Sequence, residues 1–350
     1  MLSREHKDWR RSAAALKFFY KDYSMQLTDL DVLRQANVWF EQHKSFWMCT
    51  IIGTYGSAPR PIGSIFITDG NQRVGSISGG CLEDAFVEML ERGEFEPHDQ
   101  IFVYGKHLDD TNVVKELPCG GTIRLLVEPI LQNTDNRQHL QQWLAKAEAK
   151  KPCQRIIDLS SKTSHKQLIE LANETAQVIS ETETTISLTY GQVWSLLLLG
   201  VGQVTQHVAE LGIMAGYDVR LCDMRKELAD SWTFTKDKGG VDIEWRSPDE
   251  FIEQYANERS AVLALAHDPR IDDVGLMTVF ETKAFYIGAM GSSRTSDKRQ
   301  ERLQRICGFS DKEFERLHAP IGLPIGSKTP VEIAIAIMAD IIRVRNGKPR

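Results

Sequence analysis

The stretch that decides the fold is VWSLLLLGVGQVTQHVAELGIMAGYDVRLCD, residues 193–223. Residues 193–199 form a continuous apolar run, which predicts a buried strand. A helical pattern then continues to Ala215, and residues 218–222 form a second apolar strand. Strand, glycine turn, helix and strand are the parts of a parallel βαβ unit. We therefore expect the second half of the chain to be a Rossmann-like domain with a parallel sheet.

The turn inside this unit carries Gly200 and Gly202, and the second strand ends at Asp223. Glycines at these positions permit a tight turn and the close approach of a pyrophosphate, while the acid can bind a ribose hydroxyl. The third position of the glycine pattern is Thr205, which crowds the helix against the strand, and Arg225 follows the acid. The pattern predicts the fold and leaves open whether the domain binds a dinucleotide such as NAD(P).

Polar residues also follow the next two predicted strands of this half, residues 261–266 and 285–287. In an open α/β sheet, the carboxyl ends of the strands line the ligand crevice. A strand-to-helix turn with glycines, hydroxyls and an arginine favours a phosphate group. The candidate binding residues at these two turns are His267, Asp268, Gly288, Gly291, Ser292 and Arg294.

The first half contains a different glycine turn, GSISGGCLED, at residues 75–84. It lies between a predicted strand and a predicted helix, so N–H groups near Gly79 and Gly80 are expected to converge on an anion. Cys81 would lie in the first helical turn, where the helix dipole favours the thiolate. Glu83 could act as a base or as a favourable first-turn charge. The alternative is structural, with a tight turn and a small buried cysteine.

A second cysteine, Cys119, adjoins Gly120 and Gly121 before a predicted strand. Two cysteines are too few for a structural zinc site, which needs four ligands. They could contact the metal of a bound cofactor, relay sulfur as a persulfide, or have no chemical role.

The rest of the first half alternates helices and strands. The spacing predicts a helix at residues 139–149, a strand at 154–159, another helix at 165–174 and a hairpin that ends at Tyr190. This segment completes the first domain and carries no evident chemistry.

The composition, 42% hydrophobic and 26% charged over 350 residues, is that of a globular protein. At about 150 residues per domain, this length predicts two domains. We place a mixed α/β domain at residues 28–190 and the Rossmann-like domain at residues 191–350. Residues 1–27 are expected to form an amphipathic helical extension and not a twin-arginine signal, because Lys17, Lys21 and Asp22 interrupt the apolar stretch.

Charge and cysteine usage exclude several classes of function. The net charge of −6 argues against a nucleic-acid binder, whose domains are strongly basic. No apolar run approaches the roughly 18 residues that suggest a membrane span. The six cysteines are dispersed, without a CxxC pair, which fits a protein of the reducing cytoplasm.

The loops GSAPRPIGS, GSISGGCLED, PCGG, HDPRIDD, IGAMGSSR and PIGLPIGSKTPVEIAIAI together resemble those of the xanthine dehydrogenase accessory family, XdhC/CoxI. The similarity runs from about Leu30 to Arg343. Matching positions in the first half are Gly56, Ser57, Arg60, Gly79, Gly80, Cys81, Glu83, Cys119, Gly120 and Gly121. Those in the second half are Gly200, Gly202, Asp223, His267, Asp268, Gly288, Gly291, Ser292 and Arg294.

The resemblance implies a molybdenum cofactor chaperone. Such a protein binds molybdopterin cofactor, assists its sulfuration, and helps to insert it into a xanthine dehydrogenase or a similar molybdenum hydroxylase. The implied partners are that client enzyme and a cysteine desulfurase, and we expect a homodimer. The form of the cofactor, with or without a nucleotide, stays open.

The residues and the resemblance lead to one hypothesis. Thiolates suit soft metals and sulfur chemistry, whereas glycine turns at helix N-termini suit phosphates. Cys81 and Cys119 would approach the molybdenum or carry its incoming sulfur, with Glu83 as proton partner and Cys81 as the candidate for direct contact with the metal. The turns of the second half would hold the phosphate or nucleotide. Two alternatives remain: an NAD(P)-dependent oxidoreductase that uses the Rossmann-like domain, and a structural adaptor that docks a client enzyme.

Overall fold

A computed structural model describes residues 27–55, 60–105, 121–149, 151–160, 165–171, 179–190 and 193–349. The chain divides into two compact units, Met1–Gln192 and Val193–Arg350, and each is described by itself. The helical extension expected at residues 1–27 lies outside the described residues except for Leu27, at which α2 begins.

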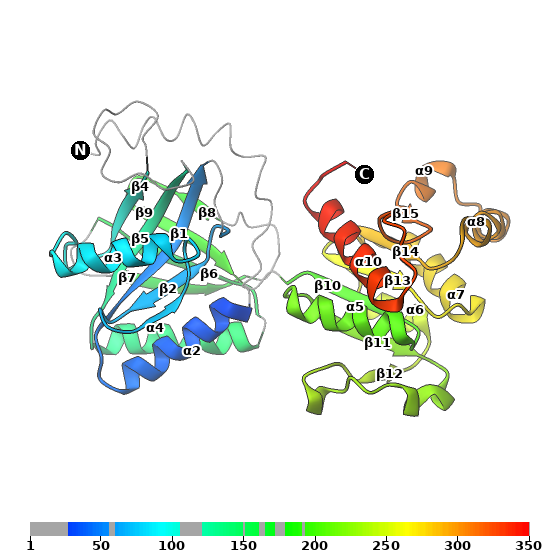
Figure 1. The fold of residues 1–350 in the computed structure, drawn as a ribbon, viewed down its shortest axis with the longest axis horizontal. Helices are drawn as coiled ribbons and strands as arrows, with labels where there is room; N and C mark the ends of the chain where they lie inside the picture. Colours follow the sequence, from blue (N-terminus) through cyan, green and yellow to red (C-terminus); the bar gives the residue numbers. More distant parts are fainter. Residues whose placement is uncertain are drawn as a thin grey trace. The chain divides into compact units, whose positions relative to one another are not determined.

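The first unit is built on a five-stranded antiparallel sheet of order β3-β2-β1-β5-β4 (Figure 1). Its strands are β1 (Phe46–Tyr55), β2 (Ile65–Thr68), β3 (Arg73–Gly75), β4 (Gln100–Tyr104) and β5 (Thr122–Ile130). Helix α3 (Cys81–Glu91) packs on one face, and α2 (Leu27–Glu41) and α4 (Thr134–Glu148) pack on the other. Because both faces are covered, β1 and β5 are buried along nearly their whole length.

A second antiparallel sheet, of order β7-β6-β9-β8, completes the first unit. Its strands are β6 (Cys153–Asp158), β7 (His165–Glu170), β8 (Ile179–Glu181) and β9 (Thr185–Tyr190). The helix predicted at residues 165–174 is therefore wrong. Residues 165–170 pair along their length with β6 as an edge strand, and this pairing overrides the helical spacing of Leu168 and Leu171. The exposed polar side chains of β7 are typical of a sheet edge.

A cluster of buried charges joins the two sheets of the first unit. Glu128 of β5 and Arg155 of β6 are fully buried, and Arg155 Nη1 donates to Glu128 Oε2 at 2.8 Å. Lys166 Nζ of β7 lies 3.1 Å from the Glu128 carboxylate and 3.5 Å from that of Asp99. The Arg155 guanidinium also stacks on the ring of Trp143, 4.5 Å from its centre. These charges compensate one another inside the core, and they link β5 of one sheet to β6 and β7 of the other.

The second unit contains a six-stranded sheet that is parallel throughout, of order β12-β11-β10-β13-β14-β15. Its strands are β10 (Ser195–Leu199), β11 (Asp218–Asp223), β12 (Ile243–Trp245), β13 (Ser260–Ala264), β14 (Tyr286–Ala289) and β15 (Leu317–His318). Numbered from its own first strand, the order is 3-2-1-4-5-6, that of dinucleotide-binding domains. The expected fold class, a mixed α/β domain followed by a Rossmann-like parallel-sheet domain, is confirmed.

Helices cover both faces of this sheet, which explains the run of leucines in β10 (Figure 1). Helices α5 (Gln203–Met214) and α10 (Pro330–Arg345) pack on one face. Helices α6 (Pro248–Tyr255), α7 (Pro269–Phe280) and α8 (Ser293–Cys307) pack on the other. Three short elements, η1 (Lys226–Ser231), η2 (Lys236–Lys238) and α9 (Asp311–Phe314), lie in the connections. Among the described residues, no helix is both long and apolar enough to span a membrane.

Candidate functional site

The chain leaves the neighbouring strands β10 and β13 in opposite directions, toward α5 on one face of the sheet and α7 on the other. At such a point the loops after the strands diverge, and ligands of open α/β sheets bind there. Gly200, directly after β10, has φ +100°, and an added Cβ would lie 2.4 Å from Ala266 Cα. Gly202 is extended, and an added Cβ would meet nothing nearer than 3.9 Å. The fold therefore requires glycine at the first position and not at the second.

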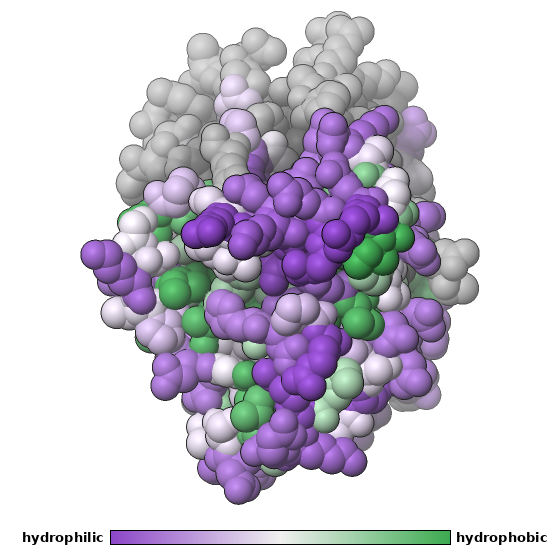
Figure 2. All heavy atoms as spheres, turned by 90° about the vertical axis from the view of Figure 1, so that its right-hand side faces the viewer, coloured by the Kyte–Doolittle hydropathy of each residue, from purple (hydrophilic) through white to green (hydrophobic). Residues whose placement is uncertain are grey.

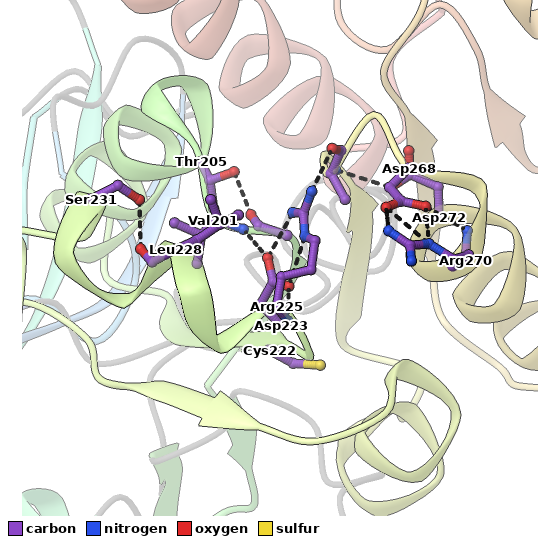
Figure 3. Close-up of polar contacts among 12 residues, drawn as sticks. Val201, Thr205, Cys222, Asp223, Arg225, Leu228, Ser231, Asp268, Arg270 and Asp272 are labelled. Carbon is purple, nitrogen blue, oxygen red and sulfur yellow. Dashed lines mark hydrogen bonds and ion pairs between the residues drawn. The ribbon is translucent and has the colours of Figure 1, made fainter.

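Asp223, the acid expected to bind a ribose, is fully buried and already bound by the protein (Figure 3). Its Oδ2 accepts from the Val201 N–H at 2.7 Å and from Arg225 Nη2 at 2.8 Å, and its Oδ1 accepts from the Arg225 N–H at 2.8 Å and Arg225 Nε at 3.0 Å. Burial alone would raise the pKa of this carboxyl, but the hydrogen bonds from Arg225 and Val201 outweigh burial and lower it. Thr205, expected to crowd the helix, donates its hydroxyl to the Gly200 carbonyl at 2.7 Å. Asp223 and Thr205 therefore bind the glycine turn itself, through the Val201 N–H and the Gly200 carbonyl.

A cleft of about 250 Å³ lies between the loop after β13 and helix α8, and we call it the basic cleft. Its lining residues are His267, Pro269, Met290, Arg294, Thr295, Lys298, Arg299 and Arg302. Arg294, Lys298 and Arg302 are spaced four residues apart, so they share one face of α8. The side of the molecule at α7 and α8 faces the viewer in Figure 2 and is dominated by hydrophilic side chains.

Two of the four cations in the basic cleft are compensated by acids of α7. The buried Arg299 donates to Asp272 at 3.2 Å, to Asp273 at 3.3 Å and to the Met290 carbonyl at 3.0 Å. Arg302 donates to Asp273 at 2.6 Å. Asp272 also accepts from the Ala266 N–H at 3.0 Å, so the Arg299–Asp272 pair fixes the loop after β13 against α8.

The predicted residues of these two turns have different roles. His267 is exposed, lines the basic cleft and has φ +55°, a left-handed conformation that is uncommon without glycine. Asp268 caps α7 by accepting from the Arg270 N–H at 2.9 Å. Gly288 lies in β14, where an added Cβ would meet Ile321 Cδ1 at 2.4 Å, so packing explains it. Ser292 caps α8 by accepting from the Thr295 N–H at 3.2 Å. Of this set, His267 and Arg294 line the cleft.

In the first unit, the turn before α3 does converge on an anion, but the anion is Glu83. This buried carboxylate accepts from the N–H groups of Ile77 at 2.8 Å, Ser78 at 3.0 Å and Gly80 at 3.0 Å. The hydroxyls of Ser76 and Ser78 also donate to it. Burial alone would raise the pKa of Glu83, but the hydrogen bonds from Ser78 and Ser76 outweigh burial and lower it to about 2. A carboxyl with that pKa stays ionised at neutral pH, so this geometry does not favour the expected role as proton partner.

Gly79 and Gly80 are exposed on this turn with φ +85° and +127°, and an added Cβ at either would meet no atom within 4 Å. Cys81 is the first residue of α3. The Cys81 side chain and the predicted residues Gly56, Ser57, Cys119 and Gly120 lie outside the described part of the chain. Arg60 is half-buried, and Gly121 is buried directly before β5. Within the described residues, no group of three or more His, Cys, Asp or Glu side chains is arranged to hold a metal ion.

Two family models match the chain. The XdhC Rossmann domain matches residues 196–341, and the XdhC and CoxI family matches residues 39–94. Together the two matches cover more than half of the chain. The chain belongs to the XdhC and CoxI family.

Relatives of this family align over most of the chain. Molybdenum cofactor insertion chaperone PaoD of Escherichia coli is 25% identical over 90% of this chain and 88% of its own length. A Bacillus subtilis protein, named as a probable xanthine dehydrogenase subunit, is 24% identical over 87% of this chain and 94% of its own length. A crystal structure described as a xanthine dehydrogenase from Bacillus halodurans covers 93% of this chain and 97% of its own, with a TM-score of 0.68 and 24% identity, and it supports the fold alone.

Lys298, Arg299 and Arg302 were not among the predicted site residues. The signal for Lys298 and Arg302 in the sequence was the spacing from Arg294, since residues four and eight positions further along a helix share its face. In such a pattern, the three cations add a positive charge that the glycines alone do not supply.

Proposed function

We propose that this chain is an accessory protein that binds molybdenum cofactor as its cargo and inserts it into a xanthine dehydrogenase-type molybdenum hydroxylase. The support is membership of the XdhC and CoxI family and the alignment of PaoD, a molybdenum cofactor insertion chaperone, with 90% of the chain. Assistance with sulfuration, by a cysteine desulfurase partner, is the finer part of the proposal.

The observation that carries this function over the oxidoreductase alternative is the state of Asp223. A dehydrogenase of this fold uses that acid to bind the cofactor ribose. Here both carboxylate oxygens are bound by Val201 and Arg225, and the carboxylate is 0% exposed. A ribose could bind Asp223 only after displacing Arg225. The buried carboxylate of Asp223 would then lose its ion pair with Arg225. The second unit thus has the sheet of a dinucleotide-binding domain, but the acid at the ribose position, Asp223, is bound by Val201 and Arg225.

The thiols that we propose for the molybdenum end are Cys81 and Cys119. Three of the other cysteines, Cys49, Cys153 and Cys222, are buried, and burial raises the pKa of each thiol, for Cys153 to about 11 and for Cys222 to about 12. Such thiols remain protonated and are poor ligands and nucleophiles. Cys307 is part-exposed at the end of α8, and burial also raises its pKa.

The test is to produce the full chain in cells that make molybdenum cofactor and to measure bound molybdenum and pterin after purification. We expect the two in equal amounts, and we expect Cys81→Ser and Cys119→Ser to lower the bound molybdenum or the sulfurated fraction of a client hydroxylase. Cys307→Ser is the matched control and should change neither. Absence of both molybdenum and pterin would overturn the proposed function. Unchanged cofactor and full client sulfuration in both variants would overturn the role of the thiols.

A further inference from the structure

The basic cleft carries more positive charge than the fold requires. Four permanent cations line it, and no carboxylate is among the lining residues, although the chain as a whole has a net charge of −6. Arg299 and Arg302 have a structural explanation, since Asp272 and Asp273 pair with them. Arg294 and Lys298 have none.

Arg294 and Lys298 have no ion-pair partner in the described part of the second unit. Within residues 193–349, neither side chain forms an ion pair with a carboxylate. They stand four residues apart on α8, a spacing at which like charges repel and destabilise a helix. Both are exposed and line the same cleft. Two cations held together without an anion are the arrangement that a bound anion would stabilise.

The backbone at the start of α8 favours the same ligand. The N–H groups of Gly291 and Ser292 have no acceptor among residues 193–349, and the first turn of α8 contains no acidic residue. The positive end of the helix dipole is therefore available, whereas at α3 Glu83 occupies the corresponding N–H groups. His267 adds a further polar side chain on the opposite wall.

The size of the cleft limits what it can hold. Sites that enclose a drug-sized ligand span about 300–1,000 Å³. At about 250 Å³, the basic cleft is smaller than these and fits one or two phosphate groups better than a whole dinucleotide. Guanidinium and ammonium groups bind phosphate oxygens through charge-assisted hydrogen bonds.

We propose that the basic cleft binds a phosphate or pyrophosphate group, with Arg294 and Lys298 as the cations that contact it. The proposal moves the phosphate site of this Rossmann-like unit away from the glycine turn after β10 and onto the turn after β14. It rests on the proposed function only for the source of the group, which would then be the phosphate end of the cargo cofactor.

The test is calorimetric titration of the full chain with sodium pyrophosphate and, separately, with inorganic phosphate, at low ionic strength. We expect pyrophosphate to bind, and each of Arg294→Gln and Lys298→Gln to weaken its binding by roughly tenfold, about 1.4 kcal/mol, because each variant loses one charge-assisted hydrogen bond. Arg305→Gln, at the other end of α8 and away from the cleft, is the matched control and should bind as the wild type does. Added salt should weaken binding. Absence of binding by the wild type, or equal binding by all three variants, would overturn the proposal.

A second arm separates this proposal from the proposed function. The same variants are produced with active cofactor synthesis, and bound pterin is measured. Loss of pterin from Arg294→Gln and Lys298→Gln, with retention in Arg305→Gln, would identify the cofactor as the source of the phosphate. Pyrophosphate binding in a chain that never carries pterin would support the cleft and overturn the chaperone. Pterin in a chain that does not bind pyrophosphate would support the chaperone function and overturn the phosphate site in the basic cleft.

Discussion

The turn at residues 76–83 and the turn at residues 290–295 are similar in backbone and opposite in charge. Both lead from a strand into a helix, and both contain glycine with positive φ. In the first turn, the carboxylate of Glu83 takes three N–H groups. In the second, no acid enters, and Arg294 and Lys298 stand beside the helix start. Glycines at a helix N-terminus therefore do not by themselves make an anion site, because the protein can supply the anion itself.

The glycine turn after β10 resembles the turn at residues 76–83, because a carboxylate of the protein binds its backbone. Its Val201 N–H donates to Asp223, a carboxylate of the protein's own, as the amides before α3 donate to Glu83. Two of these three glycine turns are thus closed internally, and the turn before α8 is left for an external anion.

The largest effect is expected from removing the internal anion of the first unit. Glu83→Ala leaves the buried Ile77 N–H and its neighbours without an acceptor, so we expect the free energy of unfolding to fall by about 4 kcal/mol. Asp84→Asn is the matched control, because Asp84 is the next residue on the same turn of α3 and pairs with Arg73 in an exposed position. It should change stability by less than about 1 kcal/mol. Urea unfolding at neutral pH measures both free energies. Equal losses in the two variants would show that Glu83 is not the anion that stabilises this turn.

The same carboxylate predicts a pH dependence. The pKa of Glu83 is about 2 in the folded protein against an ordinary value of 4.5, so its contribution is complete above about pH 4.5 and is lost as the pH falls toward 2. The shift corresponds to about 3 kcal/mol. We expect the stability difference between the wild type and Glu83→Gln to be largest at pH 7 and to shrink between pH 4.5 and pH 3. A difference that stays constant over that range would show that Glu83 does not act through its charge.

Asp223→Asn tests the second internal anion and separates the two functions of such a residue. Removing the charge leaves the partly buried Arg225 without its ion pair, so we expect a loss of about 2 kcal/mol in the free energy of unfolding. NADH fluorescence titration of the same variant should show no change from the wild type. A variant of unchanged stability with weakened NADH binding would instead identify Asp223 as a ribose ligand and favour the oxidoreductase.

The sheet of the second unit could be predicted because its strands are buried on both faces. Leu196–Leu199 are apolar at every position, which is typical of a strand covered on both faces. Polar residues follow each strand and mark its carboxyl end, so the positions of the candidate turns could be read from the sequence. The edge strand β7 could not be predicted in this way. Its pattern of polar side chains around Leu168 and Ile169 is compatible with a helix, and only pairing with β6 decides the outcome.

The partners of the site residues could not be predicted, because they depend on which way a side chain turns. Asp223 and Arg225 are two positions apart in the sequence, yet nothing there indicates that both bind the glycine turn and not a ligand. Glu83 was expected either as a base or as a first-turn charge, and the structure favours the charge. A carboxylate within a few residues of a glycine turn is thus a reason to expect that this carboxylate accepts the N–H groups of the turn.

The smallest expected effect is a change in the free energy of unfolding whose direction depends on charge at the two ends of α8. Arg294 lies at the start of α8 beside Lys298, where both the helix dipole and the like charge oppose it, so Arg294→Gln should raise the free energy of unfolding by about 0.5 kcal/mol. Arg305 lies in the last turn, where a cation is favourable, so Arg305→Gln should lower it by a similar small amount. Arginine and glutamine have comparable helix propensities, which leaves charge as the difference. Added pyrophosphate should reverse the first result, because the wild type binds the ligand more tightly and gains more stability from it than Arg294→Gln does. Urea unfolding with and without pyrophosphate measures this, and an Arg294→Gln protein that is destabilised without ligand would mean that the cleft already holds an anion of the protein's own.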